Sequence, residues 1–299
     1  MKRKVLVTGA AGFLGTRAVA KLAQDYDVYT LARSTDARLP GAIKVLLCDL
    51  KDKETLVTLE PLKEMETIVH LASHVPEGFS TTDDLGTLLA NNLTGTRNLL
   101  DCLSSLKYVC LASTIEVYGR PERVPVREGD SCRPITPYGL SKLFQEIYTD
   151  YYCTQNEVAL TILRFATIYG QGEKYARAIP NFIKAVLSDR PVQIAGEGNV
   201  MRDYVYIDDA VEGIEAALRK RKEGRFNVTG GHPISMKELA RLVADLCGKK
   251  LKVERRPSGP NSFDNYLSPR NAAKALGFVA KTPLKEGLKR EIEYFRHTT

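Results

Sequence analysis

A tyrosine and a lysine stand four residues apart in the segment PYGLSK, as Tyr138 and Lys142. The segment has helical periodicity, so both side chains should lie on one helix face. A tyrosine that exchanges protons near neutral pH needs a pKa near 7, about three units below its ordinary value, which costs ~4 kcal/mol. An ammonium ~4 Å away supplies about that much at an effective dielectric constant of ~20. The spacing therefore predicts that Tyr138 is a general acid–base and that Lys142 lowers its pKa.

Two hydroxyl-bearing residues, Ser113 and Thr114, stand upstream of this pair in CLASTIEVYG, where an apolar run ends. If that run is a strand of a parallel sheet, both residues lie at the carboxyl ends of the strands, where such sheets bind ligands. A hydroxyl there can hydrogen-bond a reacting oxygen without carrying charge. The three residue types together predict proton transfer to or from a hydroxyl or carbonyl oxygen.

Three glycines, Gly9, Gly12 and Gly15, follow the first apolar run in VLVTGAAGFLG. Between a strand and a helix, glycines at this spacing allow a tight turn, close approach of a pyrophosphate and close packing of the helix. The helix that opens at Phe13 and Leu14 offers free backbone N–H groups to the anion. The segment predicts a dinucleotide site, with a purely structural turn as the alternative.

The second apolar run ends in VYTLARS, with Arg33 placed 24 residues after Gly9. A carboxylate at this position would bind the ribose hydroxyls of NAD and repel a 2′-phosphate. A guanidinium instead donates two N–H groups to phosphate oxygens and can stack on adenine. Arg33, with the Ser34 hydroxyl beside it, predicts that NADP is preferred over NAD; an exposed arginine in a polar loop is the alternative.

These residues need a sheet to bring them together, and the first half of the chain supplies the pattern for one. Six short, nearly continuous apolar runs are separated by helix-length segments, which is typical of an α/β, doubly wound parallel sheet of the Rossmann type. They cover residues 4–7, 27–32, 43–47, 67–72, 107–113 and 158–165. After residue 166, Gly and Pro become denser and helical patterns remain near 208–219, 235–246 and 283–296.

We therefore predict a dinucleotide-binding domain over residues 1–166, to which 201–229 returns, and a smaller substrate-binding lobe formed by 167–200 and 230–299. The 43 Lys and Arg residues exceed the 36 Asp and Glu, which favours anionic ligands. Nucleic acid is less favoured, because the basic residues are scattered apart from RKRK at 219–222. The six cysteines and four histidines show no metal-binding or disulfide spacing. No apolar stretch approaches the ~18 residues of a membrane helix, so we expect a cytoplasmic protein without membrane partners.

Taken together, TGAAGFLG, the strand end with Thr114, and YGLSK resemble the extended short-chain dehydrogenase/reductase family, and in particular its NAD(P)-dependent nucleotide-sugar epimerase/dehydratase branch. CDL at 48–50, HLAS at 70–73 and NLTGTRNLL at 92–100 extend the resemblance, as do LRFATIYGQG, IPNFIKAV and MRDYVYIDDAVEGI. The resemblance implies that Thr114, rather than Ser113, holds the reacting oxygen. It also implies cofactor contacts at Asp49, Leu50, Leu71 and Ala72.

The resemblance further implies a nucleotide diphosphate sugar as the partner. Arg202 and Arg270 stand where the family clamps the diphosphate, and bidentate guanidinium bonding suits that role. A surface ion pair with Asp203 or Asp209 is the alternative for Arg202, and a helix cap is the alternative for Asn181, the other nucleotide contact. The role of Glu116 is open between a hydrogen bond to the sugar and no role in the site. A homodimer is implied through helices near 84–105 and 137–153, with Leu85, Leu88, Leu89 and Leu93 at the contact or facing the sheet.

Three functions fit these residues. The first is an NAD(P)-dependent nucleotide-sugar epimerase, acting at C4 through a 4-keto intermediate; the second is an NADPH-dependent nucleotide-sugar 4-ketoreductase, which Arg33 favours. The third is a non-catalytic NADP-sensing or RNA-binding relative, disfavoured because all three catalytic residue types are present. Dehydration is disfavoured because Ile115 replaces the acid that dehydratases of the branch carry between Thr114 and Glu116.

Overall fold

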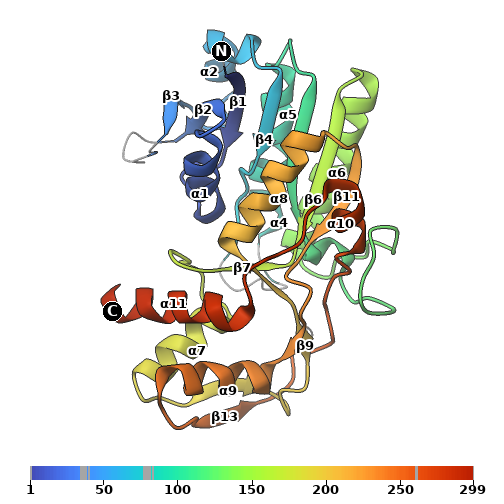
Figure 1. Ribbon diagram of the computed structural model, residues 1–299. Helices are drawn as coiled ribbons and strands as arrows, with labels where there is room; N and C mark the ends of the chain where they lie inside the picture. The colour runs from blue at the N-terminus through green and yellow to red at the C-terminus, as the bar shows by residue number, and fades with distance from the viewer. Residues whose placement is uncertain are drawn as a thin grey trace.

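The six apolar runs of the first half form neighbouring strands of one parallel sheet (Figure 1). A computed structural model describes residues 2–33, 39, 41–76, 82, 84–259 and 262–298; Ser34 lies outside these residues. The strands are β1 (Arg3–Thr8), β2 (Tyr26–Ala32), β3 (Ala42–Leu47), β4 (Thr67–His70), β5 (Tyr108–Thr114) and β6 (Ala159–Phe165). Over the described residues a seventh, β11 (Gly224–Val228), completes the order β11-β6-β5-β4-β1-β2-β3. The predicted fold class is confirmed.

Strand order reverses direction between β1 and β4, because β2 and β3 lie on one side of β1 and β4, β5, β6 and β11 on the other. Loops that leave β1 and β4 run to opposite sides and open a crevice at the carboxyl ends of the strands. The glycine turn after β1 and the hydroxyl residues at the end of β5 both lie along this crevice, so the topology places them in one site.

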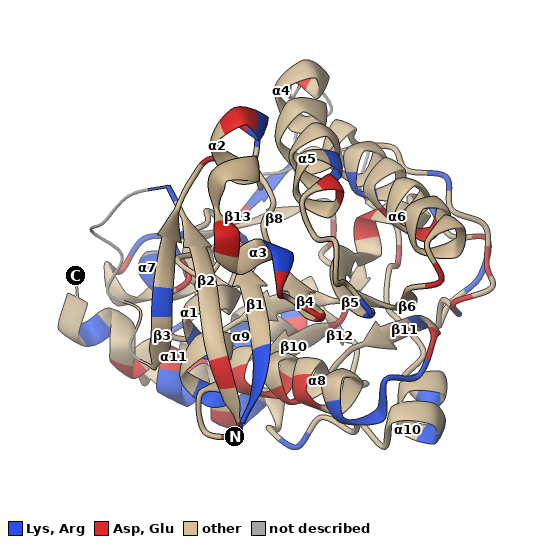
Figure 2. Ribbon diagram, turned by 90° about the horizontal axis from the view of Figure 1, so that it is seen from above, with Lys and Arg blue, Asp and Glu red and all other residues tan. Residues whose placement is uncertain are grey.

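Apolar residues alternate along the strands between two cores, one on each face of the sheet. In β1, Val5 and Val7 belong to the core beneath α1 (Phe13–Leu22) and α8 (Ile207–Lys220), which pack on each other. Leu6 belongs to the opposite core, with residues from or near the helices of that layer. These helices are α2 (Lys53–Thr58), α3 (Glu60–Lys63), α5 (Gly95–Asp101) and α6 (Pro137–Gln155). Figure 2 shows both helix layers beside the sheet, and Lys and Arg spread over many elements.

A short helical run leads into α5 and lies against α6. It consists of α4 (Leu85–Leu89), capped by the side chain of Asp84, and the π-helical turn η1 (Ala90–Thr94). Contacts of α4, η1 and α5 with α6 make a helical layer, in which α6 lies over β5 and β6. Beyond β5, a short 3₁₀ helix, η2 (Ile115–Tyr118), leads the chain away from the sheet.

The later part of the chain builds a lobe with its own core beyond the carboxyl ends of the strands (Figure 1). Its strands pair in twos: β7 (Thr167–Tyr169) with β10 (Tyr204–Tyr206), β8 (Val192–Ala195) with β13 (Val253–Arg256), and β9 (Met201–Arg202) with β12 (Ile234–Ser235). Its helices are α7 (Ala178–Leu187), α9 (Met236–Cys247) and α11 (Leu284–Thr298). The domain boundaries drawn from the sequence stay a prediction. Helix α10 (Arg270–Leu276) packs on strand β11 and on helix α8, which covers the sheet, rather than in this lobe.

Helix α6 is held to the sheet by a buried ion pair. The Arg164 guanidinium on β6 lies 2.6 Å from a carboxylate oxygen of Glu146 on α6, and both side chains are almost fully buried. The Ser113 hydroxyl on β5 donates a further hydrogen bond to the same carboxylate. At its start the helix is capped by Thr136, whose side chain accepts from the Gly139 N–H. These contacts fix how α6 is turned about its own axis. No helix among the described residues has the length and apolar character needed to cross a membrane.

Candidate active site

A cavity of about 1350 Å³ lies between the carboxyl ends of the strands and the C-terminal lobe. Its volume exceeds the ~300–1,000 Å³ typical of a site for one small ligand. The glycine turn lines one part of it, residues of β5 and α6 line the middle, and α7, β8 and β9 line the far part. The cavity therefore has room for a dinucleotide and a second nucleotide-sized ligand in contact.

Backbone geometry at the glycine turn fits a dinucleotide. Gly9 has φ +67°, and a Cβ there would lie 2.6 Å from the backbone nitrogen of Ala72, while one at Gly15 would overlap the Gly9 carbonyl oxygen. Gly12 begins α1 without a side-chain cap, so the N–H groups of the first helical turn face the cavity unsatisfied by a cap. All the cofactor-side residues predicted from the sequence and described by the structure line the cavity: Gly9, Gly12, Phe13, Leu14, Gly15, Arg33, Asp49, Leu50, Leu71, Ala72, Tyr138 and Lys142.

Arg33 follows the last residue of β2 and lines the cavity with its side chain exposed. It stands on the opposite side of the glycine turn from Tyr138, because β2 and β5 lie on opposite sides of β1. The position is the one at which the adenosine ribose of a dinucleotide lies in this fold. The partner predicted beside it, Ser34, lies outside the described residues.

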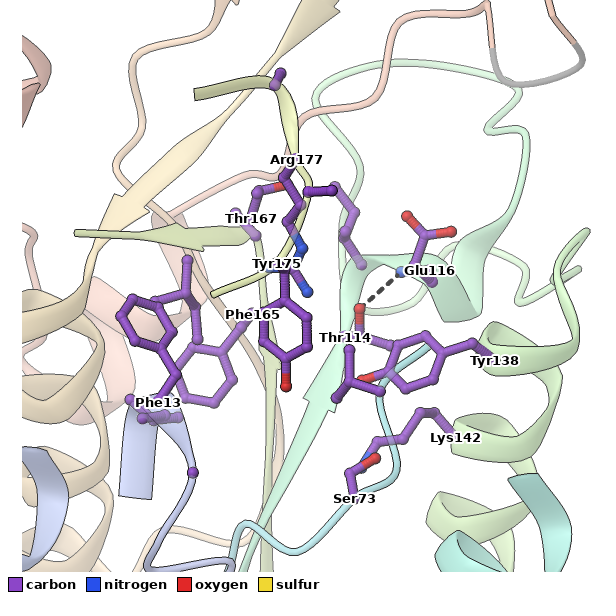
Figure 3. A pocket seen from close by; sticks show the side chains of 18 of the residues that line it. Phe13, Ser73, Thr114, Glu116, Tyr138, Lys142, Phe165, Thr167, Tyr175 and Arg177 are labelled. Atoms are coloured by element: carbon purple, nitrogen blue, oxygen red, sulfur yellow. Dashed lines mark hydrogen bonds between the residues drawn. The ribbon is translucent and has the colours of Figure 1, made fainter. Parts of the chain in front are cut away.

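Tyr138 points into the cavity from the first turn of α6, next to Thr114 (Figure 3). Burial raises the pKa of Tyr138 to about 12, opposed first by the positive charge of Arg177 and then by a hydrogen bond with Ser73. Desolvation favours the neutral phenol, and the leading opposing charge comes from Arg177, on the loop before α7. That Lys142 lowers this pKa during the reaction stays a prediction.

Lys142 lies one helical turn after Tyr138 and is fully surrounded by protein and cavity. Its ammonium donates to the Ala112 carbonyl oxygen at 2.7 Å and to the side-chain oxygen of Gln145. Burial lowers the pKa of Lys142 to about 7, and the Glu146 carboxylate acts against this shift. A charge on Lys142 at neutral pH therefore depends on the oxygens around it.

The two hydroxyls at the end of β5 have different surroundings. Ser113 donates to the buried carboxylate of Glu146 and is occupied in holding α6. Thr114 lines the cavity, and its oxygen accepts the Glu116 N–H at 3.2 Å, which leaves its proton for a ligand (Figure 3). The structure thus supplies a physical reason to prefer Thr114 as the group that holds a reacting oxygen.

Glu116, Arg177 and Arg202 form a charged wall across the cavity from the dinucleotide turn. Burial raises the pKa of the Glu116 carboxyl, and the charges of Arg202 and Arg177 oppose the rise. Arg202 donates to the Met201 carbonyl at 2.9 Å and to that of Phe263, and its guanidinium lies 5.8 Å from the Phe263 ring centre. Arg202 is also among the residues that line the cavity.

Two substrate-side predictions have different outcomes. Asn181 lines the cavity from the first turn of α7, and the cap position of that helix belongs to Arg177 rather than to Asn181. Arg270 does not line the cavity: it is exposed at the start of α10, which packs on β11 and α8. The structure gives no support for the predicted diphosphate contact of Arg270, because α10 belongs to the layer covering the sheet.

Sequence reasoning missed Arg177 and Tyr175, which stand in the loop between β7 and α7. The Arg177 guanidinium lies 4.8 Å from the Tyr175 ring centre and 3.6 Å from the buried carboxylate of Glu173. Figure 3 shows both side chains beside Thr114 and Tyr138. The available signal was a run of charged and aromatic residues, EKYAR, between a Gly-rich turn and a helix. No group of three or more potential ligand side chains in the described ranges is arranged to hold a metal ion.

Comparison with known proteins agrees with this geometry. Residues 5–229 match the model of the NAD dependent epimerase/dehydratase family, and the chain belongs to that family. An uncharacterized UDP-glucose epimerase of Bacillus subtilis is 31% identical, with 97% of each chain covered.

Solved structures resemble the whole chain as well. UDP-glucose 4-epimerase of Thermotoga maritima, solved with UDP-glucose, is 28% identical, with a TM-score of 0.90 and 99% of each chain covered. A Bacillus cereus UDP-glucuronic acid 4-epimerase variant, solved with a fluorinated UDP-glucuronic acid and NAD, is 26% identical, with a TM-score of 0.90, 99% of this chain and 100% of that chain covered.

The glycine turn gives a direct test of the dinucleotide site. We expect Gly15→Ala to abolish binding of NAD(H) and NADP(H), because the added methyl group meets the backbone of Gly9 and Ala10 and pushes α1 off the turn. Titration calorimetry measures the loss. Gly129→Ala is the matched control, since no atom lies within 4 Å of a Cβ at Gly129. Wild-type affinity in Gly15→Ala would place the dinucleotide elsewhere.

Proposed function

We propose that the protein is an NAD(P)-dependent nucleotide-sugar 4-epimerase whose substrate is a UDP-sugar. One observation carries the proposal: a single cavity joins a dinucleotide turn to Thr114, Tyr138 and Lys142 and continues to Arg177 and Arg202. Relatives named as epimerases of UDP-glucose and UDP-glucuronate support the choice of substrate class.

The residues divide the reaction between them. Tyr138 takes the proton of the sugar 4-hydroxyl as the C4–H bond breaks, and returns it to the 4-keto oxygen when that bond re-forms on the other face. A dinucleotide held by the glycine turn would supply the acceptor, and then the donor, of the hydride at C4. Thr114 donates a hydrogen bond to the reacting oxygen, while the charges of Lys142 and Arg177 favour the phenolate. Arg202 is placed to bind the diphosphate.

Dehydration is not supported by the cavity wall. Ile115 is buried in the core beside the sheet, so Glu116 is the carboxyl group that this turn presents to the cavity. Elimination of water across two carbons needs an acid and a base in addition to the tyrosine. One carboxyl group between the arginines is better suited to binding a sugar hydroxyl.

A panel of UDP-sugars tests the proposed reaction. We expect interconversion of a UDP-sugar and its C4 epimer without net consumption of cofactor. Chromatography of the products measures this interconversion. Tyr138→Phe should lower kcat by roughly 10²–10⁴-fold, because it removes the acid–base group. Tyr151→Phe, on the exposed face of the same helix, is the control. Stoichiometric oxidation of NADPH in the presence of a 4-keto sugar nucleotide would reject the epimerase and favour the 4-ketoreductase as the function.

Arg33 favours that alternative and also sets a cofactor preference. We propose that its guanidinium binds the 2′-phosphate of NADP, although the structures of relatives name NAD. Loss of one hydrogen bond to a charged group costs ~1.5–3 kcal/mol, so Arg33→Asp should shift the NADP-to-NAD preference toward NAD by roughly tenfold or more. Affinities measured by nicotinamide fluorescence report the ratio. Lys44→Asp, on the neighbouring strand and away from the cavity, controls for charge; an unchanged ratio in Arg33→Asp rejects this role.

We also propose a homodimer, formed through the outer face of α6. Phe144, Ile147 and Tyr151 are 38, 55 and 63% exposed and lie at helical spacing on one face. Leu88, predicted either at this contact or facing the sheet, is buried, while α4 and η1 lie alongside α6. Ile147→Lys together with Tyr151→Lys should give monomers in analytical ultracentrifugation, with Lys285→Glu as an exposed control on α11. A dimer that survives the double substitution excludes this face.

A further inference from the structure

The ammonium of Lys142 is held by a buried amide that the reaction itself does not require. Gln145 is fully buried on α6, and its side-chain oxygen accepts a hydrogen bond from Lys142 Nζ. The Ala112 carbonyl on β5 accepts a second at 2.7 Å. An ammonium has three N–H donors, so these two oxygens leave one for a ligand in the cavity and set its direction.

The orientation of the Gln145 amide follows from its other neighbours. Thr96 donates its hydroxyl proton to the Asn92 carbonyl oxygen at 2.6 Å. Its oxygen can then only accept, and the Gln145 amide nitrogen donates to it at 2.7 Å. Turning the amide over would set two acceptors against each other at Thr96 and two donors against each other at Lys142. Thr96 therefore directs the Gln145 oxygen toward the lysine.

A histidine completes this buried chain and ties it to the glycine turn. Burial and the nearby Lys142 lower the pKa of His70 to about 3, so its ring is neutral and has one N–H. His70 Nε2 lies 2.8 Å from the Thr96 oxygen and 3.2 Å from the Gln145 amide nitrogen. Because the Thr96 oxygen can only accept, we assign the proton to Nε2, which donates to Thr96, and the Gln145 nitrogen donates to Thr96 rather than to the ring. Nδ1 then accepts from the Thr8 hydroxyl at 2.6 Å. The Thr8 oxygen in turn accepts the Ala72 N–H at 3.2 Å, so each hydroxyl in the chain is satisfied.

We propose that Gln145 is a positioning residue that keeps Lys142 protonated and directed at the cavity, with its own amide locked by Thr96 and His70. The importance of Gln145 for catalysis rests on the proposed function. Its effect on Lys142 rests only on the hydrogen-bond chain from α6 to β1. Gln145 touches neither the cavity nor a ligand; it acts through Lys142.

The charges around Lys142 make this role decisive. Glu146 of α6 is the carboxylate whose charge acts on Lys142, and it is already shared with Arg164 of β6. His70 of β4 is neutral at pH 7, and Tyr138 of α6, whose pKa burial raises to about 12, is protonated. From η1 and α5, Asn92 and Thr96 carry no charge, and β5 contributes the Ala112 carbonyl. Glu116 of η2 lies toward the arginines. The Gln145 oxygen is therefore one of the two groups that solvate the ammonium directly.

Two substitutions should move the lysine in opposite directions. Gln145→Met keeps the length of the side chain and removes the acceptor, so the pKa of Lys142 should fall from about 7 by about one unit. Gln145→Glu places a carboxylate against the ammonium and should raise it by about one unit or more. The protonated form exists below the pKa and is lost as pH rises through it. At a pH above both values, a one-unit fall makes the protonated fraction about tenfold smaller.

Lysine ¹³Cε NMR titration of the purified protein measures the midpoint without substrate, with Lys142→Met to assign the resonance. Gln155→Met and Gln155→Glu are matched controls, because Gln155 is exposed at the end of the same helix. The proposal predicts that the Lys142 midpoint is lower in Gln145→Met and higher in Gln145→Glu than in the wild type. In the two Gln155 controls the midpoint should stay at the wild-type value. The pH at which kcat falls should follow the same order.

Midpoints that stay at the wild-type value, or that move in the same direction in both Gln145 variants, overturn the proposal. If Gln145→Met does not fold, as judged by thermal unfolding, the rise in Gln145→Glu decides alone. Wild-type protein that turns over none of the UDP-sugars, but whose midpoints separate as predicted, rejects the proposed function and leaves the role of Gln145 standing.

Discussion

Glu146 and Arg164 meet in the interior, and the arrangement of the site depends on their contact. A buried charge without its partner is costly, so breaking such a pair costs ~3–5 kcal/mol. The pair joins α6 to β6, and Ser113 adds a bond from β5. Lys142 and Tyr138 precede Glu146 by four and eight residues and share its helix face. The same contact that fastens α6 to the sheet therefore turns the tyrosine and the lysine toward the crevice.

Burial shifts the pKa values of these two residues in opposite directions, and each shift favours the neutral form of its residue. The pKa of Tyr138 rises and that of Lys142 falls because the surrounding protein solvates charge poorly. The groups that oppose these shifts come from separate elements: Arg177 from the loop before α7, and Glu146 from α6. The carbonyl of Ala112 and the amide of Gln145 add hydrogen bonds to the lysine. The reactivity of the pair is thus set by residues far apart in the chain.

Features of the site that depend on local pattern were predictable. The six strands were predicted within one or two residues, because each is a short apolar run, although β3 at the edge of the sheet is mostly exposed. The glycine turn was predictable because only glycine fits the close approach of Gly9 to Ala72 and of Gly15 to Gly9. Arg270 was placed less well, and for Leu88 the sequence left two faces open. An exposed helix start and a bundle contact look alike in sequence, and packing decides which face is covered.

By itself, the sequence determined the parallel sheet, the dinucleotide turn and the tyrosine–lysine pair, since each follows from the spacing of neighbouring residues and the geometry of one strand or helix. Tertiary structure alone decided that Arg177 reaches Tyr138, that Ser113 serves the ion pair while Thr114 faces the cavity, and that Gln145 holds Lys142. Those outcomes depend on which side chains meet across α6, β5 and the C-terminal lobe. In a buried site, the charge that a group carries depends on such neighbours, because the surrounding protein solvates charge poorly.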